Sequence, residues 1–467
     1  MYRMVSLWFE SALLPSGWAR GVRLTASAGR IEQVSAATRP QPGDERHAIA
    51  LPGLPNVHSH AFQRGIAGLT ERRAAGEDSF WSWRELMYRF LERIDPEELE
   101  AISALCFAEM LEAGFTHVGE FHYLHHDPDG APFADPGELA GRVVAAAARS
   151  GIGLTLLPVF YAHGGFGGAA PAPRQRRFVS DVEGFARILE SCRRAVQPLA
   201  GASVGVAPHS LRAVTPQELS AIVQLAQAGV VHIHIAEQLR EVKECRAWSG
   251  QRPIEWLLAS QPLGPRWCLV HATHATAAEL GGIAACGAIA GLCPITESSL
   301  GDGIFPAADF LKRGGRLGIG SDSNILLDAA QELRTLEYSQ RLAQRARNVL
   351  AAGADVSTGR TLFERALHGG WRALQAEPGA SLTGLAAGGS LDLVTLRSSH
   401  AALLERQGDE ILDSWIFAGG RELIDCVFRA GERLVTDGRH RDRDALVAGY
   451  ARAAQAARMS AFQGVRT

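Results

Sequence analysis

The 467-residue chain lacks the long apolar segments that membrane-spanning proteins need. No stretch reaches the roughly 18 consecutive apolar residues required to cross a bilayer as a helix. The first residues, MYRMVSLWFESALLPSGWARG, also lack an uninterrupted apolar region followed by a small-residue cleavage site. We therefore expect a cytoplasmic protein with no membrane partner.

The sequence also lacks closely spaced cysteine pairs and a large net charge. The seven cysteines are an odd number, lie far apart and include no C-x-x-C pair, which argues against a disulfide scaffold. The formal net charge of -3 gives no general attraction to nucleic acid, so we expect no nucleic-acid partner. Lysine is almost absent: Lys243 and Lys312 are the only two.

What the chain does contain is a regular alternation of short apolar runs and helical segments in its central part. This alternation predicts repeated strand–helix units and a parallel sheet. The segments DPEE, TPQE and TAAE each place an N-cap residue three positions before a glutamate, which is typical of a helix start. Eight such units favour a (β/α)8 TIM barrel with insertions over a doubly wound sheet. The eight apolar runs end near Val57, Phe121, Val159, Pro208, His234, His271, Cys293 and Asp322.

The two ends of the chain share a different texture. Near the N-terminus, Val22, Leu24 and Ala26 alternate with polar or small residues, as in a half-buried strand. Apolar strands flanked by turn residues return at 391–396 and 426–431. We expect the two ends to pair in a small β-sandwich domain. The expected limits are 1–50 with 377–440 for the small β domain, 51–376 for the barrel and 441–467 for a C-terminal helix.

Two H-x-H pairs stand at the ends of predicted strands. His58 and His60 point the same way on an extended strand, so both imidazoles can reach one metal ion. His232 and His234 form the second pair, and Glu237 follows in an H-x-x-E arrangement. With 16 histidines in the chain, one such pair carries little weight by itself. We interpret His232, one pleat repeat deeper, as a hydrogen-bonded core residue.

Two more predicted strands end in residues suited to metal or proton chemistry. CLVH delivers His271, and LGIGSD delivers Asp322. The carboxyl ends of barrel strands meet at one face, where barrel active sites lie. A hydrolytic metal site needs ligands, an open coordination position and a proton carrier. The sequence therefore predicts a metal site at this face, with Glu237 available to carry a proton.

Together these motifs resemble the amidohydrolase superfamily, and the resemblance covers nearly the whole chain, including the split β domain. It is carried by LPGLPNVHSHAFQRGIAGLTE, DSFWSWRELMYRF, GEFHYLHH, VAPHSLRAV, HIHIAEQ, LVHATH and GSDSN. The resemblance implies catalysis by Glu237, His271 and Asp322. It also implies one divalent metal, zinc with ferrous iron as the alternative, held by His58, His60, His234 and Asp322.

A single metal ion is expected because the residue that bridges two ions in binuclear relatives is missing. Those relatives use a carbamylated lysine or another acid near the end of the fourth strand. Here that region reads VAPHS, and Lys243 and Lys312 lie elsewhere.

Within the superfamily, the same stretches are similar to the formimidoylglutamate deiminases. This similarity implies hydrolysis of N-formimino-L-glutamate, a small dicarboxylate substrate, and assembly as a homodimer. Guanidinium groups bind carboxylates through paired hydrogen bonds, so arginines are expected around the two carboxylates of the substrate. The alternative is a related deaminase acting on a heterocycle of the guanine, adenosine, cytosine or pterin type. The residues that the similarity assigns to substrate binding are Gln63, Arg84, Tyr123, His209 and Arg212.

Overall fold

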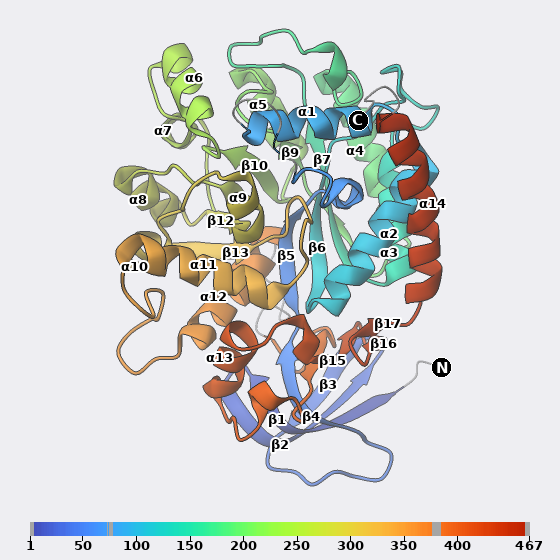
Figure 1. The fold of residues 1–467 in the computed structure, drawn as a ribbon, viewed down its shortest axis with the longest axis vertical. Helices are drawn as coiled ribbons and strands as arrows, with labels where there is room; N and C mark the ends of the chain where they lie inside the picture. The colour runs from blue at the N-terminus through green and yellow to red at the C-terminus, as the bar shows by residue number, and fades with distance from the viewer. Residues whose placement is uncertain (1–3, 72, 74–77, 376–383, 463–467) are drawn as a thin grey trace.

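The computed structural model describes residues 4–71, 73, 78–375 and 384–462. Strands from both chain ends form one eight-stranded sheet below the barrel (Figure 1), in the order β17-β16-β15-β14-β4-β1-β2-β3. These strands are β1 (Val5–Leu14), β2 (Gly17–Ser27), β3 (Arg30–Ser35), β4 (Glu45–Pro52), β14 (Leu393–Leu396), β15 (Ile424–Arg429), β16 (Glu432–Thr436) and β17 (Arg439–His440).

The N-terminal and C-terminal strands of this sheet meet where β4 and β14 pair. The two strands are antiparallel, with Leu393 opposite Pro52. In β2 the alternating residues Val22, Leu24 and Ala26 are buried and belong to a core that is separate from the barrel core. The predicted β domain built from both chain ends is therefore confirmed. The expected limits of this domain and of the terminal helix include residues 376–383 and 463–467, which lie outside the described residues.

Eight strand positions form a closed parallel barrel. The fourth position is short, because it consists of two two-residue pieces that both pair with β7. Bridges between Val206 and Val231 and between Ser59 and Asp322 close the ring. The predicted (β/α)8 barrel is therefore confirmed. Its strands are β5 (Leu54–Ser59), β6 (Phe115–His122), β7 (Gly153–Phe160), β8 (Ser203–Val204), β9 (Ala207–Pro208), β10 (Val231–Ile235), β11 (Trp267–His271), β12 (Ile289–Leu292) and β13 (Arg316–Ile319).

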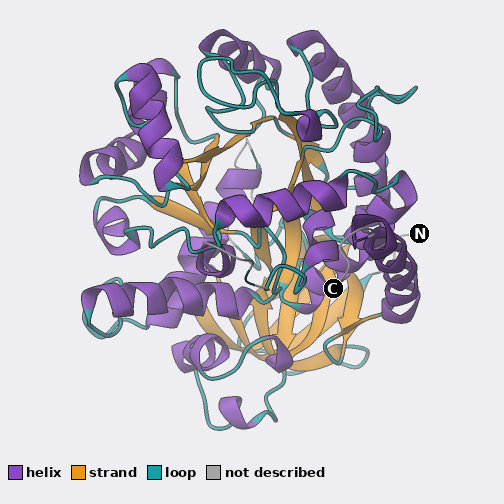
Figure 2. Ribbon diagram, turned by 45° about the horizontal axis from the view of Figure 1, so that its top comes forward, coloured by secondary structure: helices purple, strands orange, loops and turns teal. Residues whose placement is uncertain are grey.

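Helices surround the barrel strands (Figure 2), and three of them begin at the predicted caps. Asp95, Thr215 and Thr276 each accept a hydrogen bond from the backbone N–H three residues later, within a complete capping box. The helices are α1 (Phe80–Leu91), α2 (Pro96–Glu112), α3 (Glu138–Ser150), α4 (Val182–Val196), α5 (Pro216–Leu225), α6 (Leu239–Ser249), α7 (Pro253–Ser260), α8 (Ala277–Cys286), α9 (Pro294–Leu300), α10 (Ala307–Lys312), α11 (Ala329–Gln344), α12 (Thr358–Leu374), α13 (Asp409–Phe417) and α14 (Arg443–Phe462).

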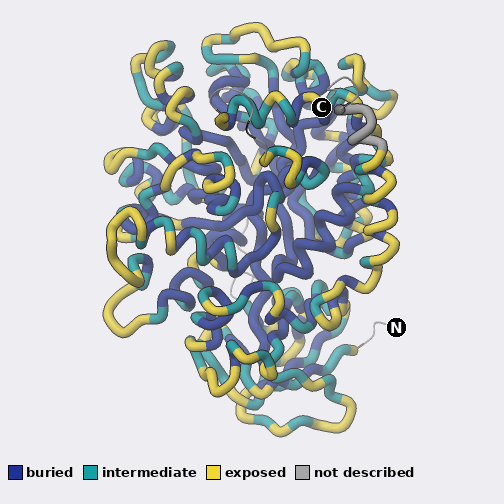
Figure 3. Tube along the Cα trace, in the orientation of Figure 1, coloured by how far each residue is buried: buried dark blue, intermediate teal, exposed yellow. Residues whose placement is uncertain are grey.

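Burial is deepest along the barrel strands (Figure 3), where every residue of β5, β6, β7, β10 and β11 is buried. The terminal helix α14 packs on α2 along the outside of the barrel (Figure 1). Among the helices that the structure describes, none combines the length and apolar character needed to span a bilayer.

Candidate active site

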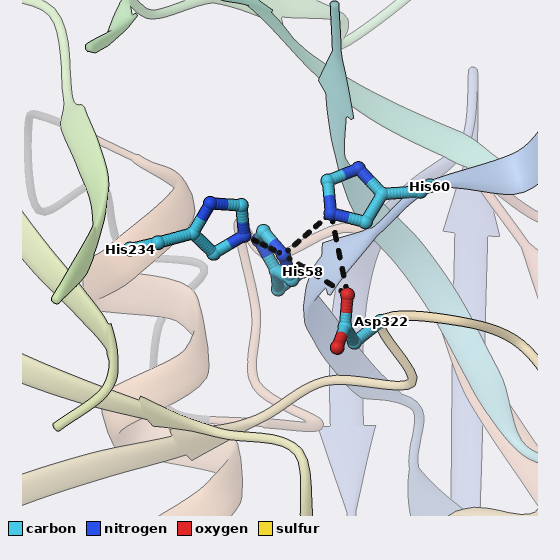
Figure 4. A group of neighbouring side chains, drawn as sticks. All are labelled: His58, His60, His234 and Asp322. Atoms are coloured by element: carbon cyan, nitrogen blue, oxygen red, sulfur yellow. Dashed lines mark hydrogen bonds and ion pairs between the residues drawn. The ribbon is translucent and has the colours of Figure 1, made fainter. Parts of the chain in front are cut away.

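Four side chains predicted to bind metal converge at the carboxyl end of the barrel (Figure 4). His58 lies near the end of β5 and His60 directly follows that strand, while His234 lies in β10 and Asp322 follows β13. Strands that are far apart in sequence are neighbours in a closed parallel barrel, and their carboxyl ends share one face. One potential ligand atom from each of the four residues lies within 4.8 Å of the others.

The ring nitrogens of the three histidines are very close together. His58 Nε2 is 3.2 Å from His60 Nε2 and 3.0 Å from His234 Nε2. Asp322 Oδ1 lies 3.2 Å from His60 Nε2 and 3.4 Å from His58 Nε2. All four residues are buried. The arrangement therefore gathers three imidazole nitrogens and one carboxylate oxygen in a space that water hardly reaches.

The hydrogen bonds of the outer ring nitrogens show which form these imidazoles take. His60 Nδ1 lies 2.8 Å from the carbonyl oxygen of Phe121, and His234 Nδ1 lies 3.1 Å from that of His209. A carbonyl only accepts, so each Nδ1 carries the proton and each Nε2 presents a lone pair. Burial lowers the pKa of His58 to about 3, which keeps this imidazole neutral as well. Buried lone pairs that face one another need a cation between them, so these residues fit a divalent metal.

The backbone is shaped to bring these ligands together. A Cβ atom at Gly320 would lie 2.8 Å from the backbone nitrogen of His58, so only glycine permits this approach of β13 to β5. His271 and Asp322 have φ angles of 69° and 44°, in the left-handed region that non-glycine residues rarely adopt. Such conformations cost roughly 1–3 kcal/mol each and persist where surrounding contacts enforce them.

His271 and Glu237 lie beside the ligand cluster. His271 Nε2 is 3.9 Å from Glu237 Oε1 and 3.9 Å from Asp322 Oδ2. Its Nδ1 is 3.2 Å from Glu297 Oε1. Burial by itself lowers the pKa of His271, but the three surrounding carboxylates raise it to about 10. Burial also raises the pKa of Glu237. The pair therefore supplies a cationic imidazole and a carboxyl group that can carry a proton.

All five predicted substrate-binding residues line the same cavity as three of the four predicted metal ligands, His60, His234 and Asp322. We call this the active-site cavity. Gln63 comes from the 3-10 turn after β5 and Arg84 from α1, while Tyr123 follows β6, and His209 and Arg212 follow β9. The wall of the cavity consists of His60, Gln63, Phe80, Trp83, Arg84, Met87, Tyr88, Tyr123, Tyr161, Phe178, His209, Arg212, His234, Glu237, His271, Leu300 and Asp322.

Several polar atoms in this wall lack partners. The Nε atoms of Arg84 and Arg212 and the Oε1 atom of Gln63 are buried without a hydrogen-bond partner among the residues that the structure describes. A buried polar group left unpaired costs free energy, so such atoms in a cavity wall are suited to a ligand. The unpaired guanidinium donors indicate an anionic ligand.

Comparison with known proteins now identifies the family. The family model "Amidohydrolase family" matches residues 49–357, and the model "Formimidoylglutamate deiminase HutF, N-terminal domain" matches residues 4–48. A formimidoylglutamate deiminase from Pseudomonas aeruginosa is 49% identical over 439 residues, which are 94% of this chain and 96% of the relative. The chain belongs to the formimidoylglutamate deiminase family.

Other amidohydrolases resemble this chain to different degrees. A crystal structure of an amidohydrolase from Brucella melitensis has a TM-score of 0.93 and 52% sequence identity, covering 97% of this chain and 99% of that one. An 8-oxoguanine deaminase from Pseudomonas aeruginosa is only 29% identical, over 71% of this chain and 73% of its own. The predicted resemblance to the amidohydrolases over nearly the whole chain, including the split β domain, is thereby confirmed.

Some residues around the site of this deiminase family member were not predicted from sequence. Glu297 binds His271 and also accepts a hydrogen bond from the backbone N–H of Cys293 at 2.9 Å. Its position four residues after Cys293, where the seventh apolar run ends, was a signal that could have been used to predict it. Three guanidinium groups lie over the ring of Trp81 in α1, those of Arg240 at 4.4 Å, Arg84 at 4.5 Å and Arg212 at 5.8 Å. No pattern in the sequence pairs Trp81 with α6.

Proposed function

We propose that this protein hydrolyses N-formimino-L-glutamate to N-formyl-L-glutamate and ammonia, a step of histidine degradation. The observation that carries the proposal is the pair of unpartnered guanidinium donors, on Arg84 and Arg212, in the same cavity as the histidine ligands. The relative with 49% identity over almost its full length supports the same reaction. One zinc ion per chain is the proposed cofactor, with His58, His60, His234 and Asp322 as its ligands.

Each residue beside the ligands has a part in the proposed reaction. A bound divalent ion supplies Lewis acidity, which lowers the pKa of water to about 7. Asp322 uses Oδ1 toward the ligand histidines and Oδ2 toward His271, so Oδ2 is free to take the proton of the attacking water. The cationic His271 stabilises the oxygen on which negative charge develops. Glu237 protonates the formimino nitrogen as water adds, which gives an amino group. The proton taken up by Asp322 then passes to the same nitrogen, the hydroxyl proton returns to Glu237, the C–N bond breaks to release ammonia, and the C=O bond forms.

The other end of the substrate is proposed to bind between α1 and the loop after β9. Arg84 and Arg212 each donate to one carboxylate, and the amide of Gln63, the hydroxyl of Tyr123 and the ring of His209 complete the contacts. Gln63 and Tyr123 already hydrogen-bond to each other at 3.1 Å, which fixes the orientation of both. A heterocycle would leave the buried Nε donors of Arg84 and Arg212 without a ligand acceptor, so the dicarboxylate is favoured over the heterocyclic alternative.

A substrate panel tests the reaction. We expect zinc-loaded protein to release ammonia rapidly from N-formimino-L-glutamate and much more slowly from N-formimino-L-aspartate, guanine, adenosine and cytosine. Turnover of a heterocycle in place of the first compound would overturn the substrate assignment and leave the metal chemistry standing. No turnover of any of them, with zinc bound, would overturn both.

Arginine variants test the carboxylate contacts. Arg84→Gln and Arg212→Gln should each raise KM about 10- to 100-fold with a smaller change in kcat, because a hydrogen bond to a charged group contributes about 1.5–3 kcal/mol. Arg240→Gln is the matched control, since Arg240 stacks on Trp81 but is not part of the cavity wall. An unchanged KM in both cavity variants would contradict the proposal.

We further propose that the protein acts in the cytoplasm as a homodimer. All seven cysteines fall within the described residues and are free, and six of them are buried. Unpaired cysteines fit a reducing compartment. The homodimer rests on the family resemblance, and sedimentation equilibrium of the zinc-loaded protein tests it. A monomer at micromolar concentration would contradict it.

A further inference from the structure

A second group of metal-binding side chains lies in the β domain, outside the barrel. His47 belongs to β4, and Asp425 and Cys426 belong to β15. One donor atom from each of the three lies within 4.8 Å of the others. The two strands are not neighbours in the sheet, because β14 lies between them. The group therefore joins the N-terminal and C-terminal parts of the split domain, in the lower part of Figure 1.

The surroundings of His47 resemble those of a metal-binding histidine. Its Nε2 atom lies 2.9 Å from Glu45 Oε1, and Glu45 is in turn paired with Arg433 at 2.8 Å. A carboxylate that accepts the proton of one ring nitrogen leaves a lone pair on the other, which is the usual outer contact of a histidine ligand. The ring is held between Phe9, stacked at 5.9 Å, and Phe428, edge-on at 5.7 Å.

Cys426 supplies a buried sulfur atom beside Asp425. The residue is 4% exposed, and its Sγ atom donates a hydrogen bond to Asp425 Oδ2 at 3.7 Å. Its backbone N–H donates to Thr395 Oγ1 at 2.9 Å, which fixes the residue on the strand. No other cysteine pairs with it in a disulfide. The thiol is therefore held in a fixed position next to the Asp425 carboxylate.

Charge around the group favours a dication. Glu45 and Asp425 are negative, and Arg433 is positive. When a metal binds Cys426, the thiol proton leaves to solvent and a thiolate–metal bond forms. The group then carries two net negative charges, which a divalent ion balances. A sulfur, an imidazole nitrogen and a carboxylate oxygen are a donor set for zinc, with water in the fourth position.

We propose that His47, Asp425 and Cys426 form a second zinc site, separate from the catalytic centre, that links β4 to β15. This proposal does not depend on the reaction proposed above. Binding there holds the two halves of the β domain together, since one ion contacts strands that come from opposite ends of the chain.

Cobalt substitution tests the site, because a cobalt–thiolate bond gives a strong near-ultraviolet absorption band that nitrogen and oxygen ligands do not give. The full chain, stripped of metal by a chelator, is titrated with Co²⁺. We expect two ions per chain in the wild type and the thiolate band with one of them. Cys426→Ser should lose that band and one ion, while it keeps the other ion and the ammonia-releasing activity, which shows that it is folded.

Cys293 provides the matched control, because it is the other cysteine that lies among possible ligands, beside His271 and Asp322. Cys293→Ser should keep the band. His47→Gln should keep the sulfur yet weaken Co²⁺ binding at this site at least about 10-fold. One ion per chain without a thiolate band in the wild type would overturn the proposal. A band that disappears in Cys293→Ser and persists in Cys426→Ser would overturn it too.

Discussion

Two histidines of strand β10 illustrate how position within the barrel decides the role of a residue. His232 and His234 lie two residues apart on the same side of the strand. His232 uses Nε2 to donate a hydrogen bond to the carbonyl of Ala373 at 2.7 Å. His234 uses Nδ1 for its backbone hydrogen bond, to His209, and turns Nε2 toward His58. The ring nitrogen that donates to a backbone carbonyl carries the proton, so the other nitrogen is the one that keeps a lone pair for a metal.

The depth of each histidine within the barrel explains why His232 and His234 have different partners. At the level of His232 the ring meets α12, which contributes the carbonyl of Ala373. At the level of His234, the strand end, side chains from β5, β10 and the residues after β13 share one space. Loss of His234 should therefore affect metal binding and catalysis, and loss of His232 should affect stability alone.

The largest effect is expected from His234→Asn. Removing one of four ligands should lower bound zinc by about one ion per chain, the catalytic one, and bring ammonia release to the uncatalysed background. Metal analysis of the purified variant, beside the ammonia assay, measures both. A variant that retained stoichiometric zinc and activity would show that His234 is no more a ligand than His232 is.

A smaller effect is expected from Glu237→Gln. This side chain lies beside His271 at the strand end but outside the ligand group, so zinc content should stay unchanged. Loss of proton transfer to the leaving nitrogen should lower kcat about 10²- to 10⁴-fold. Loss of zinc in this variant would instead place Glu237 among the ligands.

The smallest effect is expected from His232→Gln, which keeps an N–H donor for Ala373 but cannot titrate. Burial lowers the pKa of His232 to about 4, so the unfolded chain binds a proton there at a higher pH than the folded one does. This histidine therefore stabilises the fold fully above pH 6.5 and loses that contribution as the pH falls toward 4. Between pH 6.5 and 5 the loss is about 1.5 kcal/mol.

Urea unfolding at several pH values measures this effect. The wild type should lose more stability than His232→Gln over this range, while kcat and zinc content should match. Identical pH profiles would show that His232 does not remain neutral in the folded protein.

Sequence alone predicts the side of the cavity that holds the metal ligands well, because strand periodicity and barrel closure determine it. Strand periodicity orients His58 with His60, and barrel closure brings His271 and Asp322 to the same face. The capping boxes at Asp95, Thr215 and Thr276 are local patterns as well, so helix starts could be predicted.

The opposite side of the cavity could be predicted only in part. Arg84 and Arg212 came from family resemblance, since no local pattern places α1 over the barrel. Tyr161 and Tyr88 line the cavity without having been predicted, because their positions depend on how loops and α1 pack in three dimensions. The left-handed backbone of His271 is equally invisible in sequence, since it results from contacts with other strands.

The pairing of Pro52 with Leu393 has a consequence for how the protein is made. During synthesis β4 emerges early, but its partner β14 follows only some 340 residues later. At about 5–20 residues per second, the ribosome needs roughly 20–70 s to supply it. Throughout this interval β4 has one edge without its final neighbour, and open strand edges promote aggregation. A nascent chain must therefore protect this edge, by a chaperone or by transient contacts, until β14 has been translated.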